Sequence, residues 1–429
     1  MSQRPDQLPV SYWHATFPPP VPEESLPAGT DVAVIGGGML GVWTAYWLAR
    51  QGVDVTLIER EVISWGATGR NGGFLTGGGA LSYRSAIDSF GRDAARAIWT
   101  VSADGRALAQ DVIGREEIDC DFRMPGIMSL ALSEADLDRK RSNVALLHED
   151  GFTAELLDRE DVQDVVRTPL GEEIAGGVLA PDGGLLHSGR YLAGLAAAAK
   201  RHGARICQAD VTEITSTGSG ATVSTASGDV EAQRVVIAVN AWTDTLVPGL
   251  AGRIVPVRGQ ILAYEPVEPV FETGVGADIT PTGEYWQQAT DGSIVIGGCR
   301  ADAPNGDVDV REMRPTPDVT AKIEGVIPRL FPDLAGLRVA RRWAGLMAFT
   351  SDYVPVADAA PGLPNVWVGG GFCGHGMPFG PRIGQLLADA AMSGQTPEAL
   401  HPFRANRESL TLLSASDTRQ ETDVIPQAE

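Results

Sequence analysis

The chain has 429 residues, more than one compact domain usually holds, and this length predicts two or three domains. Its formal net charge of −21 argues against nucleic acid as a partner, because the phosphates would be repelled. The same charge mildly favours a cationic substrate, although solubility explains it more simply. The four cysteines, Cys120, Cys207, Cys299 and Cys373, include no CxxC pair, which favours reduced thiols over a disulfide framework or a metal site.

The sequence predicts neither a membrane-spanning segment nor a signal peptide. No stretch reaches about 20 uncharged apolar residues, the length that a membrane-spanning helix needs. Residues 1–30 are polar and then proline-rich, without the layout of a signal peptide, so we expect an extended arm on a cytoplasmic protein. Residues 409–429 predict a polar tail.

Residues 31–60 have the pattern strand, glycine turn, helix, strand, acidic residue, which is typical of a dinucleotide-binding βαβ unit. The apolar run from Val32 to Ile35 predicts a parallel strand buried on both faces. Gly36 allows the tight turn, Gly38 lets the backbone approach a pyrophosphate, and Gly41 lets the helix pack close to the strand.

The second strand of the unit, Val53 to Ile58, is followed by Glu59, which is placed to accept hydrogen bonds from ribose hydroxyls. An acidic residue there favours FAD or NAD over NADP, because it would repel a 2′-phosphate. An ordinary strand–turn–helix without a ligand is the alternative, and it leaves Glu59 unexplained.

The rest of the chain alternates helical and strand patterns. A glycine-rich loop follows the βαβ unit, and two αβ blocks near the ends enclose a β-rich middle. The predicted elements are a loop at 64–79, helices within 84–150 interrupted by a strand at 122–132, a helix from Ser188 to Gly203, a strand from Arg205 to Asp210, a buried strand from Val235 to Val239, strands over 253–298 with a hairpin at Asp291 and Gly292, a helix ended by Pro332, strands over 338–358, and a strand, glycine loop and helix over 365–394.

Over residues 10–400 the chain resembles the FAD-dependent D-amino-acid oxidase superfamily of glycine and sarcosine oxidases, most of all the γ-glutamylputrescine oxidoreductase type. The motifs that carry the resemblance are SYWHAT, GGGMLG, GATGRNGG, RVVIAVNAW, RRWAGL and GGGFCGHGM. The resemblance implies an α/β plus β fold, in which a Rossmann-like FAD-binding domain of separated segments holds an inserted β-rich substrate domain. We expect residues 31–83, 151–245 and 345–408 in the FAD-binding domain, and residues 84–150 and 246–344 in the substrate domain.

The resemblance also implies that Arg70 and the residues after it lie beside the flavin. A glycine loop with one guanidinium suits an electron-rich ring, because backbone N–H groups and Arg70 can stabilise negative charge on it. A flexible surface loop is the alternative. The residues that we assign to the cofactor are Gly36, Gly38, Met39, Leu40, Gly41, Glu59, Arg60, Gly66, Ala67, Thr68, Arg70, Asn71, Gly72, Gly73, Val211, Asn240, Trp242, Gly345, Gly371, Gly374, His375, Gly376 and Met377.

Within this set, Val211 matches the position whose backbone meets adenine, and the loop around His375 would present N–H groups to the flavin. His375 could equally hold the loop by one hydrogen bond. Arg70, His375 and Tyr285 are the candidate catalytic residues, and we identify no general base.

Two departures from the family affect the expected substrate. Met347 stands where glycine oxidases carry an arginine and near where sarcosine oxidases carry the cysteine of a covalent flavin, and Pro378 replaces a lysine of sarcosine oxidases. Both departures argue against a simple α-amino acid, because a carboxylate needs a charged partner in a dry pocket. They also predict non-covalent FAD, with Cys373 as a small buried residue.

We expect the substrate to contact Tyr285, Trp286, Arg258 and Met347. The alternatives are that Tyr285 and Trp286 are packing aromatics and that Arg258 is a cation at a domain interface.

The predicted function is oxidation of the C–N bond of a small-molecule amine to an imine, which then hydrolyses, with molecular oxygen as the acceptor and hydrogen peroxide as the product. A dehydrogenase that passes electrons to a quinone or carrier is one alternative, and a non-catalytic flavin-binding protein is another. A nicotinamide-linked enzyme is a third alternative, which we disfavour because the GRNGG and GHG loops would have no function in it.

Overall fold

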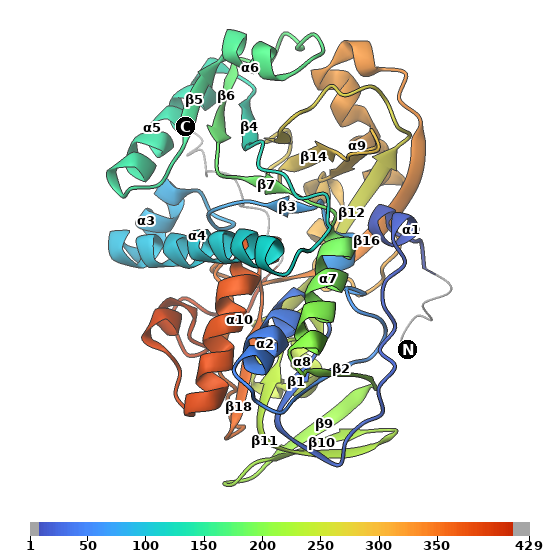
Figure 1. The fold of residues 1–429 in the computed structure, drawn as a ribbon. Helices are drawn as coiled ribbons and strands as arrows, with labels where there is room; N and C mark the ends of the chain where they lie inside the picture. Colours follow the sequence, from blue (N-terminus) through green and yellow to red (C-terminus); the bar gives the residue numbers. More distant parts are fainter. Residues whose placement is uncertain (1–7, 415–429) are drawn as a thin grey trace.

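The computed structural model describes residues 8–414, so residues 1–7 of the predicted arm and 415–429 of the predicted tail lie outside the described part. Two 8-stranded sheets organise the chain (Figure 1). The first occupies the lower half of the view and the second the upper half, and helices cover both. This arrangement confirms the α/β plus β fold class.

The first sheet is parallel at its centre, with the strand order β17-β18-β11-β1-β2-β8. Strands β9 and β10 extend it in antiparallel fashion along β11, and β17 pairs antiparallel with β18. Its strands are β1 (Gly29–Ile35), β2 (Val55–Glu59), β8 (Arg205–Gln208), β9 (Val211–Ser216), β10 (Ala221–Thr225), β11 (Gly228–Ile237), β17 (Val356–Ala359) and β18 (Val366–Gly370).

Both faces of β1 are buried, as the apolar run predicted. Val32 and Val34 contact one hydrophobic core, and Ala33 and Ile35 contact another, because successive side chains of a strand point to opposite faces. The first core lies under α2 (Met39–Arg50), α7 (Ser188–Arg201) and α10 (Gly376–Ser393).

Helix α4 (Arg92–Arg115) packs against α10, although we expected it in the substrate domain. A Cβ placed on Gly105 would overlap the carbonyl oxygen of Pro378, so the two helices are in close contact. Val101 and Val112 of α4 belong to the same core as α2 and α7. The apolar face of α4 therefore covers the cofactor side of the molecule.

The second sheet has the strand order β16-β12-β15-β14-β13-β4-β6-β5. The predicted hairpin is confirmed, since β14 and β15 pair antiparallel with Gln288 opposite Ile294. Helix α9 (Pro317–Leu330) packs on this sheet. The strands are β4 (Ile127–Ala131), β5 (Glu155–Asp158), β6 (Gly176–Ala180), β12 (Val255–Tyr264), β13 (Gly274–Ala277), β14 (Glu284–Gln288), β15 (Ile294–Gly297) and β16 (Val339–Phe349).

The second sheet also revises our expected domain boundaries. Strands β5 and β6 pair with β4, so residues 155–180 join the substrate side rather than the cofactor side. Strand β16 runs unbroken across the expected boundary at residue 345. We still propose two domains, but we now assign α4 to the cofactor side and β5 and β6 to the substrate side.

The predicted arm is partly helical. Helix α1 (Tyr12–Thr16) begins at the N-cap Ser11 and buries Trp13 against the molecule. Among residues 8–414, no helix combines the length and apolar character needed to cross a membrane. The other elements are α3 (Tyr83–Phe90), α5 (Glu134–Glu149), α6 (Arg159–Val165), α8 (Thr243–Leu246) and a small sheet of β3 (Phe74–Leu75) and β7 (Gly184–Leu185).

Candidate functional site

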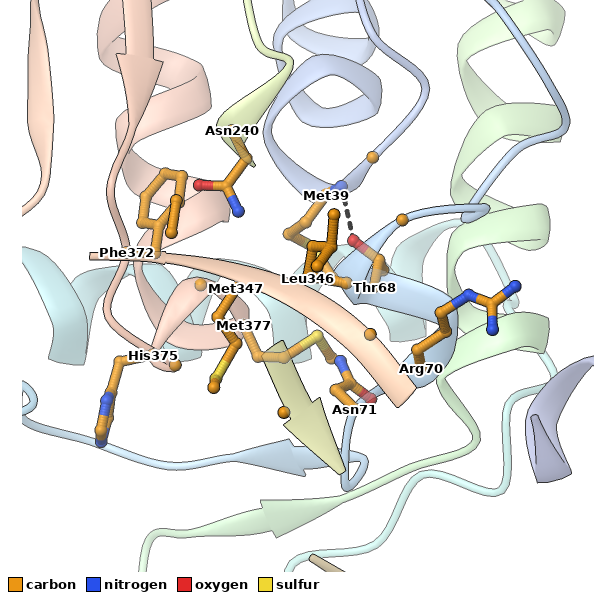
Figure 2. Close-up of a pocket in the computed structure, with 18 of the residues that line it drawn as sticks. Met39, Thr68, Arg70, Asn71, Asn240, Leu346, Met347, Phe372, His375 and Met377 are labelled. Carbon is orange, nitrogen blue, oxygen red and sulfur yellow. Dashed lines mark hydrogen bonds between the residues drawn. The ribbon is translucent and has the colours of Figure 1, made fainter. Parts of the chain in front are cut away.

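A cavity of about 460 Å³ lies at the carboxyl ends of the parallel strands β1, β2, β8, β11 and β18. Its volume is in the range of ligand-binding pockets, and this edge of a parallel sheet is where such folds bind ligands. From there the cavity continues to the second sheet, where residues of β12, β13, β14 and β16 line it. Figure 2 shows side chains from both sheets around it.

The three glycines of the βαβ unit have different surroundings. A Cβ on Gly36 would lie 2.6 Å from the Ala238 carbonyl oxygen, and one on Gly41 would overlap the Gly36 carbonyl oxygen. These two glycines are needed for packing. A Cβ on Gly38 would meet only Thr68 Oγ1 at 3.6 Å, so Gly38 instead keeps the cavity open at the start of α2.

Glu59 ends β2 at the rim of the cavity. Its two oxygens accept hydrogen bonds from the backbone N–H groups of Gly37 (2.5 Å) and Glu61 (2.7 Å). Each carboxylate oxygen has a second lone pair that remains available to a ligand. Burial raises the pKa of the Glu59 carboxyl.

The end of the cavity next to Glu59 is lined by Arg60 and Trp242. Arg60 lies over the ring of Trp242 at 5.2 Å and lies 3.9 Å from Asp210. Val211, the first residue of β9, also lines the cavity. The resemblance expects the adenine at Val211, and Arg60 and Trp242 line the same cavity.

Helix η2 (Ala67–Arg70) lies within the glycine loop and contacts the start of α2. Thr68 Oγ1 accepts a hydrogen bond from the Met39 N–H at 3.0 Å, drawn in Figure 2, and so caps the first turn of α2. Gly66, Ala67 and Leu40 line the same part of the cavity.

The backbone from Gly69 to Gly72 is held by four side chains. The carbonyl oxygens of these successive residues accept hydrogen bonds from Ser11 Oγ (2.6 Å), Trp343 Nε1 (3.1 Å), Trp13 Nε1 (2.6 Å) and Gln287 Nε2 (2.5 Å), in that order. In a trans peptide the N–H points opposite to the C=O. The N–H groups of Asn71 and Gly72 therefore point the other way, and both residues line the cavity.

The side chain of Asn71 turns back onto this loop. Its Oδ1 accepts hydrogen bonds from the Gly73 N–H (3.0 Å) and Ser188 Oγ (2.6 Å). The loop is a fixed structure, not the flexible surface loop of the alternative reading.

The Arg70 guanidinium does not face the cavity, in contrast to the expected charge-stabilising role. Nε donates to the Trp65 carbonyl at 3.1 Å, and Nη1 donates to the carbonyls of Pro9 (3.2 Å) and Ala344 (3.3 Å). The group lies 4.6 Å above the Trp65 ring and points away from the other labelled side chains in Figure 2. Burial lowers the pKa of Arg70 to about 10. Arg70 thus joins the chain segments of Pro9, Trp65 and Ala344.

The loop before α10 is fixed in the same way. The Gly371 N–H donates to Asn240 Oδ1 at 3.1 Å, and the Cys373 N–H donates to the Ala348 carbonyl at 2.8 Å. His375 Nδ1 lies 3.1 Å from the Cys373 carbonyl oxygen, and desolvation lowers the pKa of the imidazole. In Figure 2 the ring turns away from the other labelled residues. This geometry supports the loop-holding role of His375 over a catalytic one.

The N-terminus of α10 reaches the cavity through Gly374, Gly376 and Met377. Together with the start of α2, it brings two helix N-termini to the cavity, and such termini favour anionic groups. Gly345 of β16 packs against the glycine loop, because a Cβ there would lie 2.9 Å from Arg70 Cβ.

At the substrate end, the structure brings Tyr285 and Met347 to the cavity but not Trp286 or Arg258. Trp286 is buried in the core of the second sheet, in edge contact with Phe271 at 5.9 Å. It points away from Tyr285 because the two are neighbours on β14. Arg258 donates to both carboxylate oxygens of Asp307, at 2.9 and 2.7 Å, and both residues lie within the expected substrate domain, so this ion pair is not a contact between the two expected domains.

The lining residues at this end that the expected set lacked include Thr282, Arg300 and Phe349. Arg300 comes two residues after the strand segment IVIGG, and a charged residue just beyond a buried strand was the signal that could have revealed it.

The sequence matches a family model of FAD dependent oxidoreductases over residues 31–390. It is 29% identical over 377 residues to gamma-glutamylputrescine oxidoreductase of Escherichia coli, covering 84% of this chain and 83% of that protein. It is 26% identical over 383 residues to glycine oxidase of Geobacillus kaustophilus, covering 88% of this chain and 97% of that protein.

Solved structures show the same fold. The crystal structure of glycine oxidase from Geobacillus kaustophilus superposes with a TM-score of 0.77 at 24% identity, covering 89% of this chain and 99% of that one. L-proline dehydrogenase from P. horikoshii superposes with a TM-score of 0.75, covering 88% and 98%. The resemblance inferred from the motifs is confirmed, and the chain belongs to the FAD-dependent oxidoreductase family.

Proposed function

We propose that this chain binds FAD without a covalent link and oxidises the C–N bond of an amine or amino acid. The observation that carries the proposal is the continuity of one cavity from Gly38 and Glu59 to Tyr285 and Met347. A ligand with an ADP group at one end and a ring at the other fits such a path. The named relatives act on amines and amino acids, which supports this substrate class.

The chain's residues divide the binding of FAD between its two ends. Gly38 leaves room for the pyrophosphate beside the α2 N-terminus, and Glu59 accepts ribose hydroxyls. The N–H groups of Asn71 and Gly72, together with the α10 N-terminus at Gly376, would contact the ring. When bound, FAD supplies the chemistry by accepting a hydride equivalent from the carbon that carries the amine.

The substrate end would orient the amine and exclude water. Tyr285 packs edge-on against Phe74 at 5.8 Å, and Met347 adds a further apolar surface. No carboxylate stands among the described lining residues at this end. In our proposal the amine reacts in its unprotonated form. Orientation and desolvation then contribute much of the barrier reduction. The oxidised substrate leaves as an imine and hydrolyses in water.

An anaerobic screen tests the proposal. Holoprotein is mixed with N-methylated amino acids, polyamines, γ-glutamyl amines and free amino acids, and the flavin absorbance is followed. We expect bleaching by at least one class. Yellow protein that no amine or amino acid bleaches would instead favour a flavin-binding protein without this catalytic function.

Two further measurements test the electron acceptor and the mode of FAD binding. Under air, we expect one hydrogen peroxide per oxidised amine, without need of an added acceptor. Turnover that requires an artificial acceptor would identify a dehydrogenase instead. Acid precipitation should release the flavin into the supernatant, whereas a yellow pellet would contradict non-covalent binding.

A further inference from the structure

The cavity extends beyond Tyr285 to the far strands of the second sheet. Counted from Met347 on β16, its lining passes Tyr285 on β14, Gly276 on β13 and Ser129 on β4. Gly276 pairs with Tyr285 on one side and with Ser129 on the other, so these three residues form one row across the sheet. Paired residues point to the same face, and two strand spacings amount to about 10 Å. The cavity therefore continues about that far past Tyr285.

The two aromatic rings at this end lie beside Gly276 and not over it. The Tyr285 ring leans toward β15, where a Cβ on Gly297 would lie 2.5 Å from its hydroxyl oxygen. The Phe74 ring covers Gly274, where a Cβ would lie 2.6 Å from Cε1 of that ring. A Cβ on Gly276 would have only one heavy atom within 4 Å, a backbone carbonyl oxygen of β14 at 3.5 Å. The floor of the cavity is therefore open at Gly276.

The fold itself does not require a glycine at residue 276. Gly274 and Gly297 are needed because aromatic rings occupy the space of their side chains, whereas Gly276 has that space open and a backbone outside the left-handed region. The pairing of β13 with β14 and β4 is regular, without a bulge. A glycine inside a regular strand weakens it and often marks the close approach of another group. Because Gly276 lines the cavity and alone in β13 is not buried, a ligand is the group that can approach it.

We propose that Gly276 determines substrate selectivity by admitting the unreactive end of an elongated amine, an inference that rests on the proposed amine oxidation. The carbon that carries the amine would lie on the side of Met347, and the rest of the chain would run over Gly276 toward Ser129. Phe74 and Ile127 give this path apolar walls. Burial of the methylene groups of the chain then supplies the binding free energy.

Equilibrium binding tests Gly276 apart from turnover. The alcohols n-butanol and n-octanol have no C–N bond to oxidise, and each is titrated calorimetrically into wild-type holoprotein, Gly276→Ala, Gly276→Val and Gly325→Val. Gly325 of α9 is the matched control, because it is exposed, lies outside the cavity and would also have open space for a Cβ. We expect wild type and Gly325→Val to bind octanol about 200-fold more tightly than butanol, since each buried methylene group strengthens binding about fourfold.

Side chains added at residue 276 should reduce this preference in the order of their size. We expect the ratio to fall to about 50-fold in Gly276→Ala and below about tenfold in Gly276→Val, while the affinity for butanol stays unchanged. A wild-type ratio near one, or a ratio in Gly276→Val equal to that of wild type, would overturn the proposal. FAD content and unfolding temperature establish that each variant is folded. If Gly276→Val does not fold, Gly276→Ala decides, and an undiminished ratio in that variant would contradict the proposal.

Flavin reduction supplies the second readout. We expect n-octylamine to reduce wild-type FAD about 200-fold more efficiently than n-butylamine, and Gly276→Val to remove most of that difference while butylamine still reduces the flavin. Equal reduction of wild type by both amines would refute the role of Gly276 and leave amine oxidation intact. If no amine reduces the flavin, the proposed function fails, and the alcohol titrations still decide the role of Gly276.

Discussion

At the scale of single residues, the glycines of the βαβ unit have different structural roles. Gly41 packs against the Gly36 carbonyl, whereas Gly38 faces open space. Substitution to alanine should separate these roles, because the backbone of Gly38, with φ of −85°, is accessible to alanine.

We predict that Gly38→Ala folds normally but raises the dissociation constant for FAD at least about tenfold, since the new methyl group occupies space beside α2. Gly41→Ala should destabilise the apoprotein itself by about 1–3 kcal/mol, because the methyl group meets backbone. Urea unfolding of apoprotein and fluorescence titration with FAD measure the two effects. Unchanged FAD affinity in Gly38→Ala would contradict the placement of the pyrophosphate.

The tryptophans Trp343 and Trp286 are both buried, and only Trp343 holds the loop at Arg70. Trp343→Phe should destabilise the holoprotein by about 1–3 kcal/mol more than Trp286→Phe, since it leaves a buried carbonyl without its donor. Trp286 is the matched control, because its Nε1 has no hydrogen-bond partner within the described residues. Equal losses of unfolding free energy in urea would show that the hydrogen bond contributes nothing.

At the scale of elements, α1 contacts both the glycine loop and the start of α7. His14 lies 3.1 Å from Ser64 Oγ, and His187 Nε2 lies 2.9 Å from Thr16 Oγ1. Burial lowers the pKa of each of these histidines to about 4. Both are therefore neutral in the folded protein near pH 5, whereas they are largely protonated in the unfolded chain.

This difference predicts acid sensitivity. Between pH 6.5 and pH 4 the unfolded chain takes up protons that the folded chain does not, so each histidine lowers the stability by about 1.4 kcal/mol per pH unit. Above pH 6.5 the effect vanishes. His14→Gln and His187→Asn should each reduce the slope of unfolding free energy against pH, and His401→Gln, at an exposed site, should not. A slope in both variants as steep as in wild type would refute this cause.

Elements with a strong local pattern could be predicted from the sequence. The βαβ unit, the hairpin at Asp291 and the helix from Ser188 all appear where the pattern indicates. The packing partner of α4 could not be predicted from the sequence. An amphipathic pattern shows that one face of a helix is buried, but it does not show which element covers that face.

The sequence alone also could not show which way single side chains point. Arg70 and Arg258 looked alike as cations near a site, yet carbonyls bind the first and Asp307 binds the second. Only the tertiary fold brings those partners together. Tyr285 and Trp286 alternate on one strand, and the pattern alone left open which of them faces the cavity.

At the scale of the whole molecule, two sheets with separate cores meet at one cavity. The side of the first sheet supplies strand ends, helix N-termini and the loop of Asn71, which would hold FAD in our proposal. The second sheet supplies Tyr285 and Met347, which would contact the substrate. Strand β16 contributes to both, since its Gly345 contacts the Arg70 loop and its Phe349 lies under Arg300.

Anaerobic single turnover tests the central claim most directly. Holoprotein is mixed without oxygen with an amine that bleaches it, and the product is identified by mass spectrometry. Oxidation in this cavity predicts one carbonyl product and one released amine for each FAD reduced. A bleached flavin without any carbonyl product, or a product in which the C–N bond is intact, would contradict the claim.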